Sequence, residues 1–245
     1  MKIALALSGY FDSKRDSSSL GLDGFNHIKN RILDNNNVDV YIHSWDLENR
    51  NVIEDLYGPW IKESVFEEQI NFKPAFYDNE LDKYPIRQGV TMFWNVFSQF
   101  YSIQQTFKLI EEHYDVAIKA RFDLGRINRQ SSGPFNRNNP YAVQCINFDS
   151  SLDMSQIYMA KWQQSYLDNE GPADMWFYSG WENMQNFCRL YDIARSDVRY
   201  NSEYAKWAIE SSNDPHVTNT IKAWKWFFIK TGLWDKKFLL DTEWE

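Results

Sequence analysis

Three charged residues near the middle of the chain alternate with apolar ones. Lys119, Arg121 and Asp123 are separated by Ala120 and Phe122. Alternate side chains of an extended backbone leave the same face, so we expect the two cations and the carboxylate to lie side by side. Cations of this kind neutralise a bound phosphate, and a carboxylate binds a divalent metal ion. A simple pairing of Arg121 with Asp123 on the strand face is the alternative.

The element that must position these charges is a strand that begins near Tyr114 and contains the apolar run Val116-Ala117-Ile118 before Lys119. Open α/β sheets bind their ligands at the carboxyl ends of their strands, which is where the charges stand. The strand is reached from a helix predicted over Val90 to His113, a stretch without Gly or Pro whose apolar residues recur every three or four positions. The pattern therefore predicts a ligand site at the end of a buried strand.

The first part of the chain predicts a parallel sheet. Ile3 to Leu7 reads as a central strand, Leu22 to Leu33 as a helix, and Val38 to Ile42 as the next strand, an order that places the two strands in parallel. A third strand is predicted over Ser64 to Phe72, and a loop over Lys73 to Arg87. The other predicted elements are a helix over 53–60, strands over 141–146, 157–160 and 238–240, and helices over 182–194, 202–210 and 217–230.

Composition excludes several classes of function. The 26 basic and 34 acidic residues give a net charge of −8, without a basic block that nucleic acid or an anionic membrane would require. Two cysteines are too few for a disulfide framework or a cysteine zinc site, and they suit a reducing compartment. The apolar run at the amino terminus is too short for a signal sequence or a membrane span. We therefore expect one cytoplasmic α/β domain over residues 1–245, with a helical carboxyl-terminal third.

Several segments, in order, resemble those of small GT-A type glycosyltransferases of large algal (chlorella) viruses and bacterial polysaccharide clusters. The resemblance covers most of residues 1–195 and is carried by Ala4–Gly9, Val38–Asp46, Phe100–Ile103, Tyr114–Leu124, Ala173–Phe177 and Glu182–Met184. It implies a GT-A fold, Rossmann-like, with a mostly parallel central sheet flanked by helices. Residues 1–125 would form the half that binds a nucleotide-sugar, and residues 126–245 the half that binds the acceptor.

The resemblance also implies an activity. The chain would transfer a sugar from a donor such as a UDP- or GDP-sugar to a hydroxyl of a glycan or glycoprotein. A diphosphate leaving group gains negative charge as the bond to the sugar breaks, so the site needs Mn²⁺, Mg²⁺ or fixed cations. The Asp-x-Asp motif that usually holds the metal in GT-A enzymes reads Arg121-Phe122-Asp123 here. Asp123 is thus the expected donor or metal contact, with Arg121 and Lys119 able to neutralise the diphosphate directly.

Other site residues are expected at strand ends and turns. Asp174 stands where the resemblance places an acid near the acceptor, and in an inverting reaction it would take the acceptor's proton; a turn hydrogen bond is its alternative role. Ser8, Gly9 and Tyr10 follow the first strand, where the nucleoside of the donor would lie. Lys14 or Arg15 is expected to contact the phosphates. His216 is expected as a further metal ligand, although it also fits an ordinary turn.

Two further features have simpler, structural interpretations. Asp46 and Glu48 form a second acidic pair after a strand, which fits either a metal motif or a helix start in a solvated loop. His43 lies beside them, and a buried, hydrogen-bonded histidine is its simpler interpretation. A noncatalytic protein that binds carbohydrate or nucleotide on the same fold is the alternative function. A nicotinamide-dependent oxidoreductase is disfavoured, because no Gly-x-Gly-x-x-Gly follows the first strand.

Overall fold

The central strand of the protein is β1 (Lys2–Gly9), which is buried from Ile3 to Leu7. It pairs in parallel with β2 (Asn37–Ser44) on one side and with β4 (Val116–Arg121) on the other. Strands that are buried on both faces are apolar throughout, which confirms the prediction for 3–7. The computed structural model describes residues 1–11, 20–84, 93–125, 145–160, 171–172, 174–211 and 217–240.

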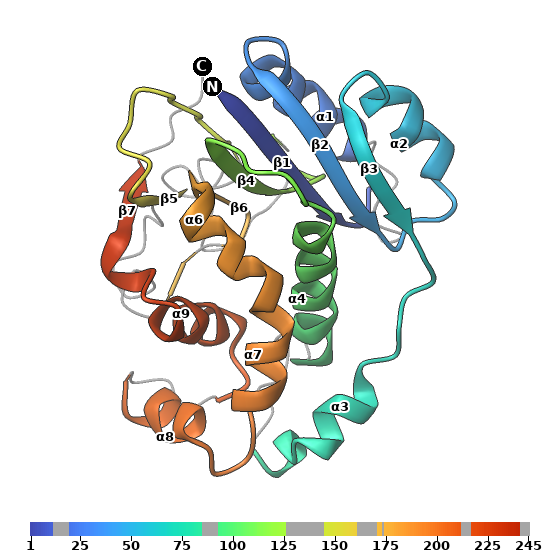
Figure 1. Cartoon of the computed structure of the whole chain (residues 1–245). Helices are drawn as coiled ribbons and strands as arrows, with labels where there is room; N and C mark the ends of the chain where they lie inside the picture. The colour runs from blue at the N-terminus through green and yellow to red at the C-terminus, as the bar shows by residue number, and fades with distance from the viewer. Residues whose placement is uncertain are drawn as a thin grey trace, which may run out of the picture.

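The sheet has seven strands in the described part of the chain, in the order β3-β2-β1-β4-β6-β5-β7 (Figure 1). Its remaining strands are β3 (Ile61–Phe66), β5 (Ile157–Ala160), β6 (Trp176–Gly180) and β7 (Lys237–Leu240). Only β6 runs antiparallel to its neighbours among these strands, because it pairs in that sense with both β4 and β5. The other adjacent strands are parallel, which confirms the predicted α/β class with a mostly parallel sheet.

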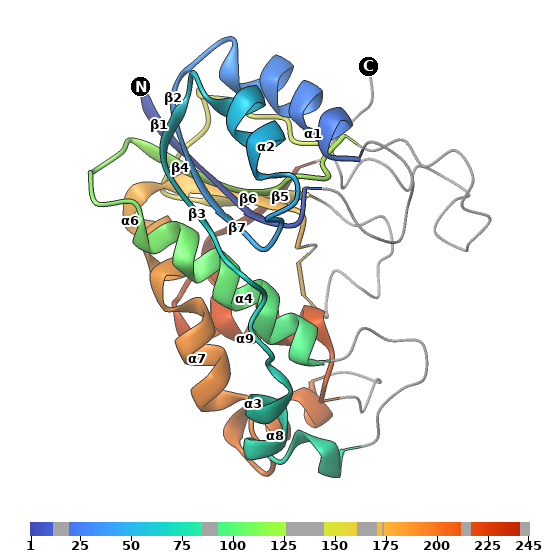
Figure 2. The ribbon, with the colours of Figure 1, turned by 90° about the vertical axis from the view of Figure 1, so that its right-hand side faces the viewer.

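Helices cover both faces of the sheet (Figure 2). Two of them, α1 (Leu20–Ile28) and α2 (Arg50–Tyr57), lie on one face, where Ile28 is buried in the same apolar cluster as Leu5. The opposite face carries α4 (Phe93–Lys108), α7 (Leu190–Asp197) and α9 (Thr220–Lys230), and there Phe100 shares a cluster with Ala6. Alternate residues of β1 thus enter two separate cores.

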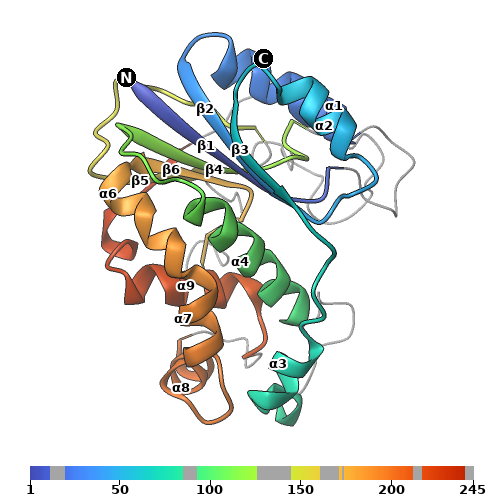
Figure 3. The same cartoon turned by 45° about the vertical axis from the view of Figure 1, so that its right-hand side comes forward.

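Shorter helices complete the described chain. They are α3 (Lys73–Asp78), α6 (Trp181–Met184), α8 (Glu203–Glu210), 3₁₀ turns at Leu81–Lys83, Gln185–Arg189 and Trp234–Lys236, and a π-helical turn at Lys29–Leu33 that extends α1. Figure 3 shows α3 and α8 at the end of the molecule farthest from α1 and α2. No helix in the described ranges has the length and apolar character needed to cross a membrane.

A glycine permits the closest contact between α1 and the sheet. A Cβ built on Gly24 would lie 1.6 Å from the backbone oxygen of Phe122 and 3.3 Å from the nitrogen of Leu124. The first distance is far below any van der Waals contact, so only glycine fits while the turn after β4 stays where it is. Helix α1 therefore packs directly against the backbone that follows Arg121.

Two predictions between residues 64 and 87 were wrong. The third strand ends at Phe66, where its pairing with β2 also ends, and not at Phe72. The segment predicted as a loop contains α3, whose first turn includes Pro74. Proline is tolerated in the first turn of a helix, since the first backbone N–H groups have no helical partner. Pro74 therefore begins an element here instead of breaking one.

The helix before β4 and the segment after it differ from prediction in their limits. Helix α4 is described from Phe93 and ends at Lys108, five residues short of His113. Of the strand predicted over 141–146, only Cys145 and Ile146 fall in the described ranges, and neither of them is in a strand. The strands predicted at 157–160 and near 238–240 and the helix at 202–210 are confirmed as β5, β7 and α8.

Candidate functional site

The carboxyl ends of the parallel strands bring the predicted site residues to one edge of the sheet. Ser8 in β1 lies opposite His43 in β2 and opposite Arg121 in β4. Because β6 is antiparallel to β4, it begins at the same edge, with Trp176 opposite Ala120. Asp174 precedes Trp176 by two residues, so it also reaches this edge. Ser8 from the first predicted segment and Asp174 from a late one therefore lie at the same edge of the sheet.

Arg121 and Asp123 form a two-point ion pair. The guanidinium donates from Nε to Oδ1 of Asp123 at 2.8 Å and from Nη2 to Oδ2 at 2.7 Å. This is the fork geometry that arginine makes with carboxylates and phosphates. Asp123 is the main cause that raises the pKa of Arg121 above its ordinary value. The alternative drawn from the sequence, that these two residues pair with each other, is confirmed.

Asp174 lies on the other side of the same guanidinium. Its Oδ2 is 3.6 Å from Nη1 of Arg121 and accepts a hydrogen bond of 2.5 Å from Nε2 of Gln99 in α4. Burial opposes ionisation of this carboxyl, but the charges of Arg121 and Lys119 outweigh burial and leave its pKa below the ordinary value. Asp174 is therefore ionised at neutral pH and held in place from two elements.

Lys119 is fully buried, and it shares a strand face with Arg121. Its Nζ donates to the backbone oxygen of Asp174, is 3.4 Å from that of Met175, and lies 5.3 Å and 5.5 Å from the ring centres of Phe177 and Trp224. Burial lowers its pKa to about 7, although the nearby carboxylates of Asp174 and Asp123 act to raise it. A direct contact with diphosphate would require Lys119 to leave both carbonyls, so its visible role is to hold the backbone at Asp174.

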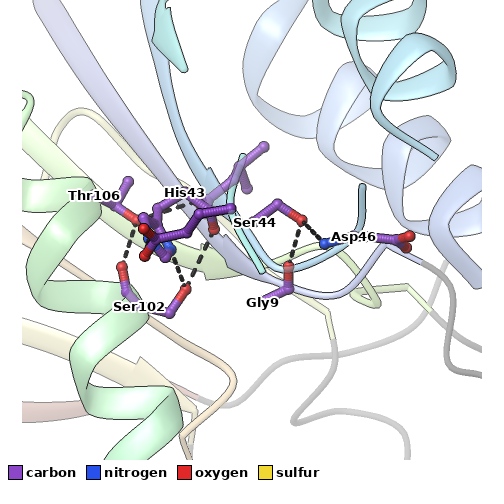
Figure 4. Close-up of polar contacts among 8 residues, drawn as sticks. Gly9, His43, Ser44, Asp46, Ser102 and Thr106 are labelled. Carbon is purple, nitrogen blue, oxygen red and sulfur yellow. Dashed lines mark hydrogen bonds and ion pairs between the residues drawn. The ribbon is translucent and has the colours of Figure 1, made fainter. Parts of the chain in front are cut away.

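The end of β1 is marked by a glycine in an unusual conformation. Gly9 has a φ of +103°, which favours glycine, and among the residues that the structure describes, apart from its two chain neighbours, none has an atom within 4 Å of a Cβ built there. Its backbone oxygen accepts a hydrogen bond of 2.7 Å from Ser44 Oγ, which itself accepts one of 3.0 Å from the Asp46 nitrogen (Figure 4). The ends of β1 and β2 are thus joined by hydrogen bonds next to Gly9.

Asp46 has the role of a loop residue. Its two carboxylate oxygens accept from the backbone and side-chain nitrogens of Asn49, at 3.3 Å and 3.0 Å. Asn49 directly precedes α2. These contacts place Asp46 in the turn before α2, and the choice between the interpretations of the acidic pair stays a prediction.

His43 is buried and hydrogen-bonded through both ring nitrogens. Nδ1 lies 2.8 Å from Ser102 Oγ, and Nε2 lies 2.9 Å from Oε1 of Glu67, which directly follows β3 (Figure 4 shows His43 and Ser102). Burial lowers the pKa of His43, while Glu67 acts in the opposite direction. The simpler interpretation of His43 is confirmed: it joins β2, β3 and α4 below the edge.

Tyr10 is partly buried and faces the exit of β3. Its hydroxyl donates to Oε1 of Gln69 at 3.0 Å, and Nε2 of Gln69 donates to Ser98 Oγ in α4 at 2.9 Å. Tyr10 therefore lies at the carboxyl edge of β1, where the sequence predicted a nucleoside. Stacking of its ring on a base remains a prediction.

The described donors do not fit a metal ion at Asp123. Both oxygens of Asp123 accept from Arg121, and a cation already occupies the place next to them. Among the residues that the structure describes, no group of three or more His, Cys, Asp or Glu side chains is placed to hold a metal. Lys14, Arg15 and His216 lie outside the described residues, so their expected roles stay predictions.

Sequence reasoning missed Gln99 and Glu67, which hold Asp174 and His43. Gln99 is one polar residue in a helix, which is indistinguishable from a solvent-facing one without knowledge of its neighbours. Glu67 would have been visible as a strand-end residue if β3 had been predicted to stop at Phe66. The missed residues thus support the predicted ones and do not form a separate site.

A solved structure of another protein is similar to this chain over most of its length. No family model matches the sequence, and no curated protein matches it. A crystal structure of mouse xyloside xylosyltransferase 1, in its apo form, is similar over 98% of this chain and 85% of that chain, with 11% sequence identity and a TM-score of 0.49. A similarity of this degree does not transfer the activity of the mouse protein to this chain.

Proposed function

We propose that this protein is a glycosyltransferase that moves a sugar from a nucleoside diphosphate donor, such as a UDP- or GDP-sugar, to a hydroxyl of a glycan or glycoprotein. The observation that carries the proposal is the meeting of Arg121, Asp123 and Asp174 at the carboxyl edge of β1 and β4. A guanidinium suits a diphosphate, and an ionised carboxylate suits the proton of a hydroxyl. The resemblance of the segments between Ala4 and Met184 to GT-A enzymes supports the same activity.

The donor is proposed to lie across the end of β1. A ribose would lie close to the backbone of Gly9, where a Cβ would meet no atom of the described residues beyond its chain neighbours, with Ser8 and Tyr10 on either side of it in the chain. The diphosphate would then reach Arg121, whose strand is hydrogen-bonded to β1. Positive charge at this point stabilises the leaving group as it becomes more negative.

The proposed chemistry assigns the proton to Asp174. In a reaction that inverts the anomeric carbon, the acceptor hydroxyl oxygen forms a bond to that carbon. The bond from the carbon to the diphosphate oxygen breaks, and its electron pair leaves with the nucleoside diphosphate. The hydroxyl proton passes to Asp174. Gln99 orients Asp174 by donating to its carboxylate, and Lys119 does so by donating to its backbone oxygen.

Arg121 supplies the positive charge in this proposal. An Mn²⁺ or Mg²⁺ ion would supply the same stabilisation to the leaving group. The expectation of a metal ion stays a prediction, because Asp123 is engaged by Arg121 and His216 is outside the described residues. Metal dependence is therefore measured in the experiment below and not assumed.

One observation favours a noncatalytic protein as the second candidate. The single carboxylate of the expected metal motif is occupied by its neighbour, so the motif as described resembles an internal salt bridge more than a metal site. Such a protein would bind nucleotide or carbohydrate at the same edge without turnover.

Thermal unfolding with a panel of nucleotide-sugars, each with and without Mn²⁺, tests both candidates. A donor at 100 times its dissociation constant adds about 2.7 kcal/mol to the free energy of unfolding. For a domain of this size the melting temperature then rises by about 5–10 °C. Release of nucleoside diphosphate in the presence of glycan acceptors is measured in parallel.

The outcomes separate the candidates. A rise in melting temperature with one donor, together with release of its nucleoside diphosphate, supports the glycosyltransferase. A rise without any turnover supports the binding protein. No rise with any nucleotide-sugar, with or without Mn²⁺, contradicts both.

A further inference from the structure

The ion pair at the sheet edge has the form of a protein–phosphate contact. Arg121 presents Nε and Nη2 to two oxygens of one anion, at 2.8 Å and 2.7 Å. A phosphate group offers two oxygens in the same arrangement, which is why arginine binds carboxylates and phosphates alike. The carboxylate of Asp123 thus occupies the place on Arg121 that a phosphate of the donor requires.

The pair is open to exchange with a ligand. The Arg121 side chain is 35% exposed and that of Asp123 24%, so both are accessible from the solvent side of the edge. Ion pairs that water reaches are weakly held, since water screens the charges. Lys119, the other cation of this strand face, is fully buried and bonded to backbone oxygens, and it is therefore less available to a ligand.

A second carboxylate depends on the same guanidinium. Nη1 of Arg121 lies 3.6 Å from Oδ2 of Asp174, the proposed acceptor of the proton. Because Nε, Nη1 and Nη2 belong to one planar group, a guanidinium that turns away from Asp123 also changes its distance from Asp174. Binding of a diphosphate to Arg121 would therefore alter both contacts together.

We infer that Asp123 is an internal competitor for the donor: it holds Arg121 while the site is empty, and the diphosphate displaces it, which also alters the contact of Arg121 with Asp174. This inference rests on the proposed function, because it takes the ligand to be a diphosphate. It gives Asp123 a role opposite to that of a metal ligand, since removal of its charge strengthens anion binding.

Calorimetric titration with EDTA present tests the inference, with inorganic pyrophosphate, UDP and GDP as probes. Asp123→Asn removes the competing charge, and we expect it to bind pyrophosphate about fivefold more tightly than the wild type does. Asp174→Asn should give a smaller gain, because its oxygen lies farther from Arg121. Asp123→Glu keeps the competing charge, so the gain of Asp123→Asn should be absent from it.

Glu112→Gln controls for net charge. It removes one negative charge at the opposite end of the strands, 112 being just before β4, and should leave the dissociation constant unchanged. Melting temperatures of all variants without ligand show whether each of them is folded.

Each result is decisive. Tighter binding of pyrophosphate to Asp123→Asn, but not to Glu112→Gln, supports the inference. Equal or weaker binding to Asp123→Asn overturns it, because Asp123 then either does not compete or helps to bind the anion. The proposed function is tested separately by UDP and GDP: if pyrophosphate binds while no nucleotide does, the competition stands and the glycosyltransferase proposal fails.

Discussion

The two ends of β1 and β4 carry ion clusters of similar composition and different construction. At the amino ends, Lys2 Nζ lies 2.5 Å from Glu112 and 3.4 Å from Asp39, and Lys62 lies 3.2 Å from Glu112. At the carboxyl ends, Arg121 meets Asp123 and Asp174. Both clusters contain more than one carboxylate, and both join residues from separate elements. They differ in how far water reaches them.

The amino-end cluster is the more exposed. Lys2, Glu112 and Lys62 are 37%, 48% and 48% exposed in their side chains, and Asp39 is 27% exposed. At the carboxyl end the exposed fractions are 35%, 24% and 26% for Arg121, Asp123 and Asp174, and a completely buried lysine lies behind them. Charges that a ligand can reach, but that lie beside buried groups, interact more strongly with that ligand than fully solvated charges do. Candidate chemistry therefore belongs to the carboxyl end, although both ends would look alike in a count of charges.

The largest effect that separates the two ends is expected from Asp174→Asn. Loss of the proposed base should lower the turnover rate by about 10²- to 10⁴-fold, because a positioned acid or base contributes a factor of this size. Asparagine still accepts the hydrogen bond of Gln99, so donor binding should persist. Release of nucleoside diphosphate and equilibrium binding of the donor are the two measurements. Retained turnover ends the assignment, and Asp192→Asn, an exposed acid in α7, is the matched control.

A smaller effect, on stability, is expected from Lys119→Met. The folded protein lowers the pKa of Lys119 from 10.5 to about 7. Between these values the unfolded chain binds more protons at this residue, so its contribution to stability increases as the pH rises from 7. Wild type should therefore gain up to about 1 kcal/mol per pH unit relative to Lys119→Met. Urea unfolding of both proteins at pH 7, 8 and 9 measures the difference. If the difference in the free energy of unfolding between the two proteins does not change with pH, Lys119 is not a buried amine with a lowered pKa.

The smallest effect is expected at the amino end, from Glu112→Gln. Exposed ion pairs often contribute nothing measurable to stability, since water and salt screen them. The melting temperature should be indistinguishable from that of the wild type, and turnover should be unchanged. A clear loss of either would mean that the two ends of the strands do not differ as their exposure indicates.

Much of the fold was predictable because its strands are apolar runs. The strands at 3–7, 38–42 and 157–160 were found in this way, and each lies within or matches an observed strand. Failures occurred where a local signal has two meanings. Pro74 marks a helix start as well as a loop, and the alternating residues after Phe66 continue the pattern of a strand that the sheet no longer pairs.

The sequence predicted which residues meet at the site but not how deeply each of them is buried. Alternation along β4 correctly placed Lys119 and Arg121 on one face, whereas Asp123 lies in the turn after the strand and reaches Arg121 from there. It gave no indication that Lys119 is covered, because the cover comes from Phe177 in β6 and Trp224 in α9, which are distant in the sequence. Alternation specifies the direction of a side chain, and long-range packing decides whether water reaches its end.

The contact at Gly24 joins the two faces of the sheet. Helix α1 covers one face, whereas Arg121 and Lys119 point to the other, yet a Cβ at position 24 would collide with the backbone of Phe122, the residue between Arg121 and Asp123. Any side chain at position 24 is therefore compatible only with a displaced turn. Sequence change at position 24, on the α1 side of the molecule, is thus restricted by the backbone that sets the spacing of two charges on the opposite side.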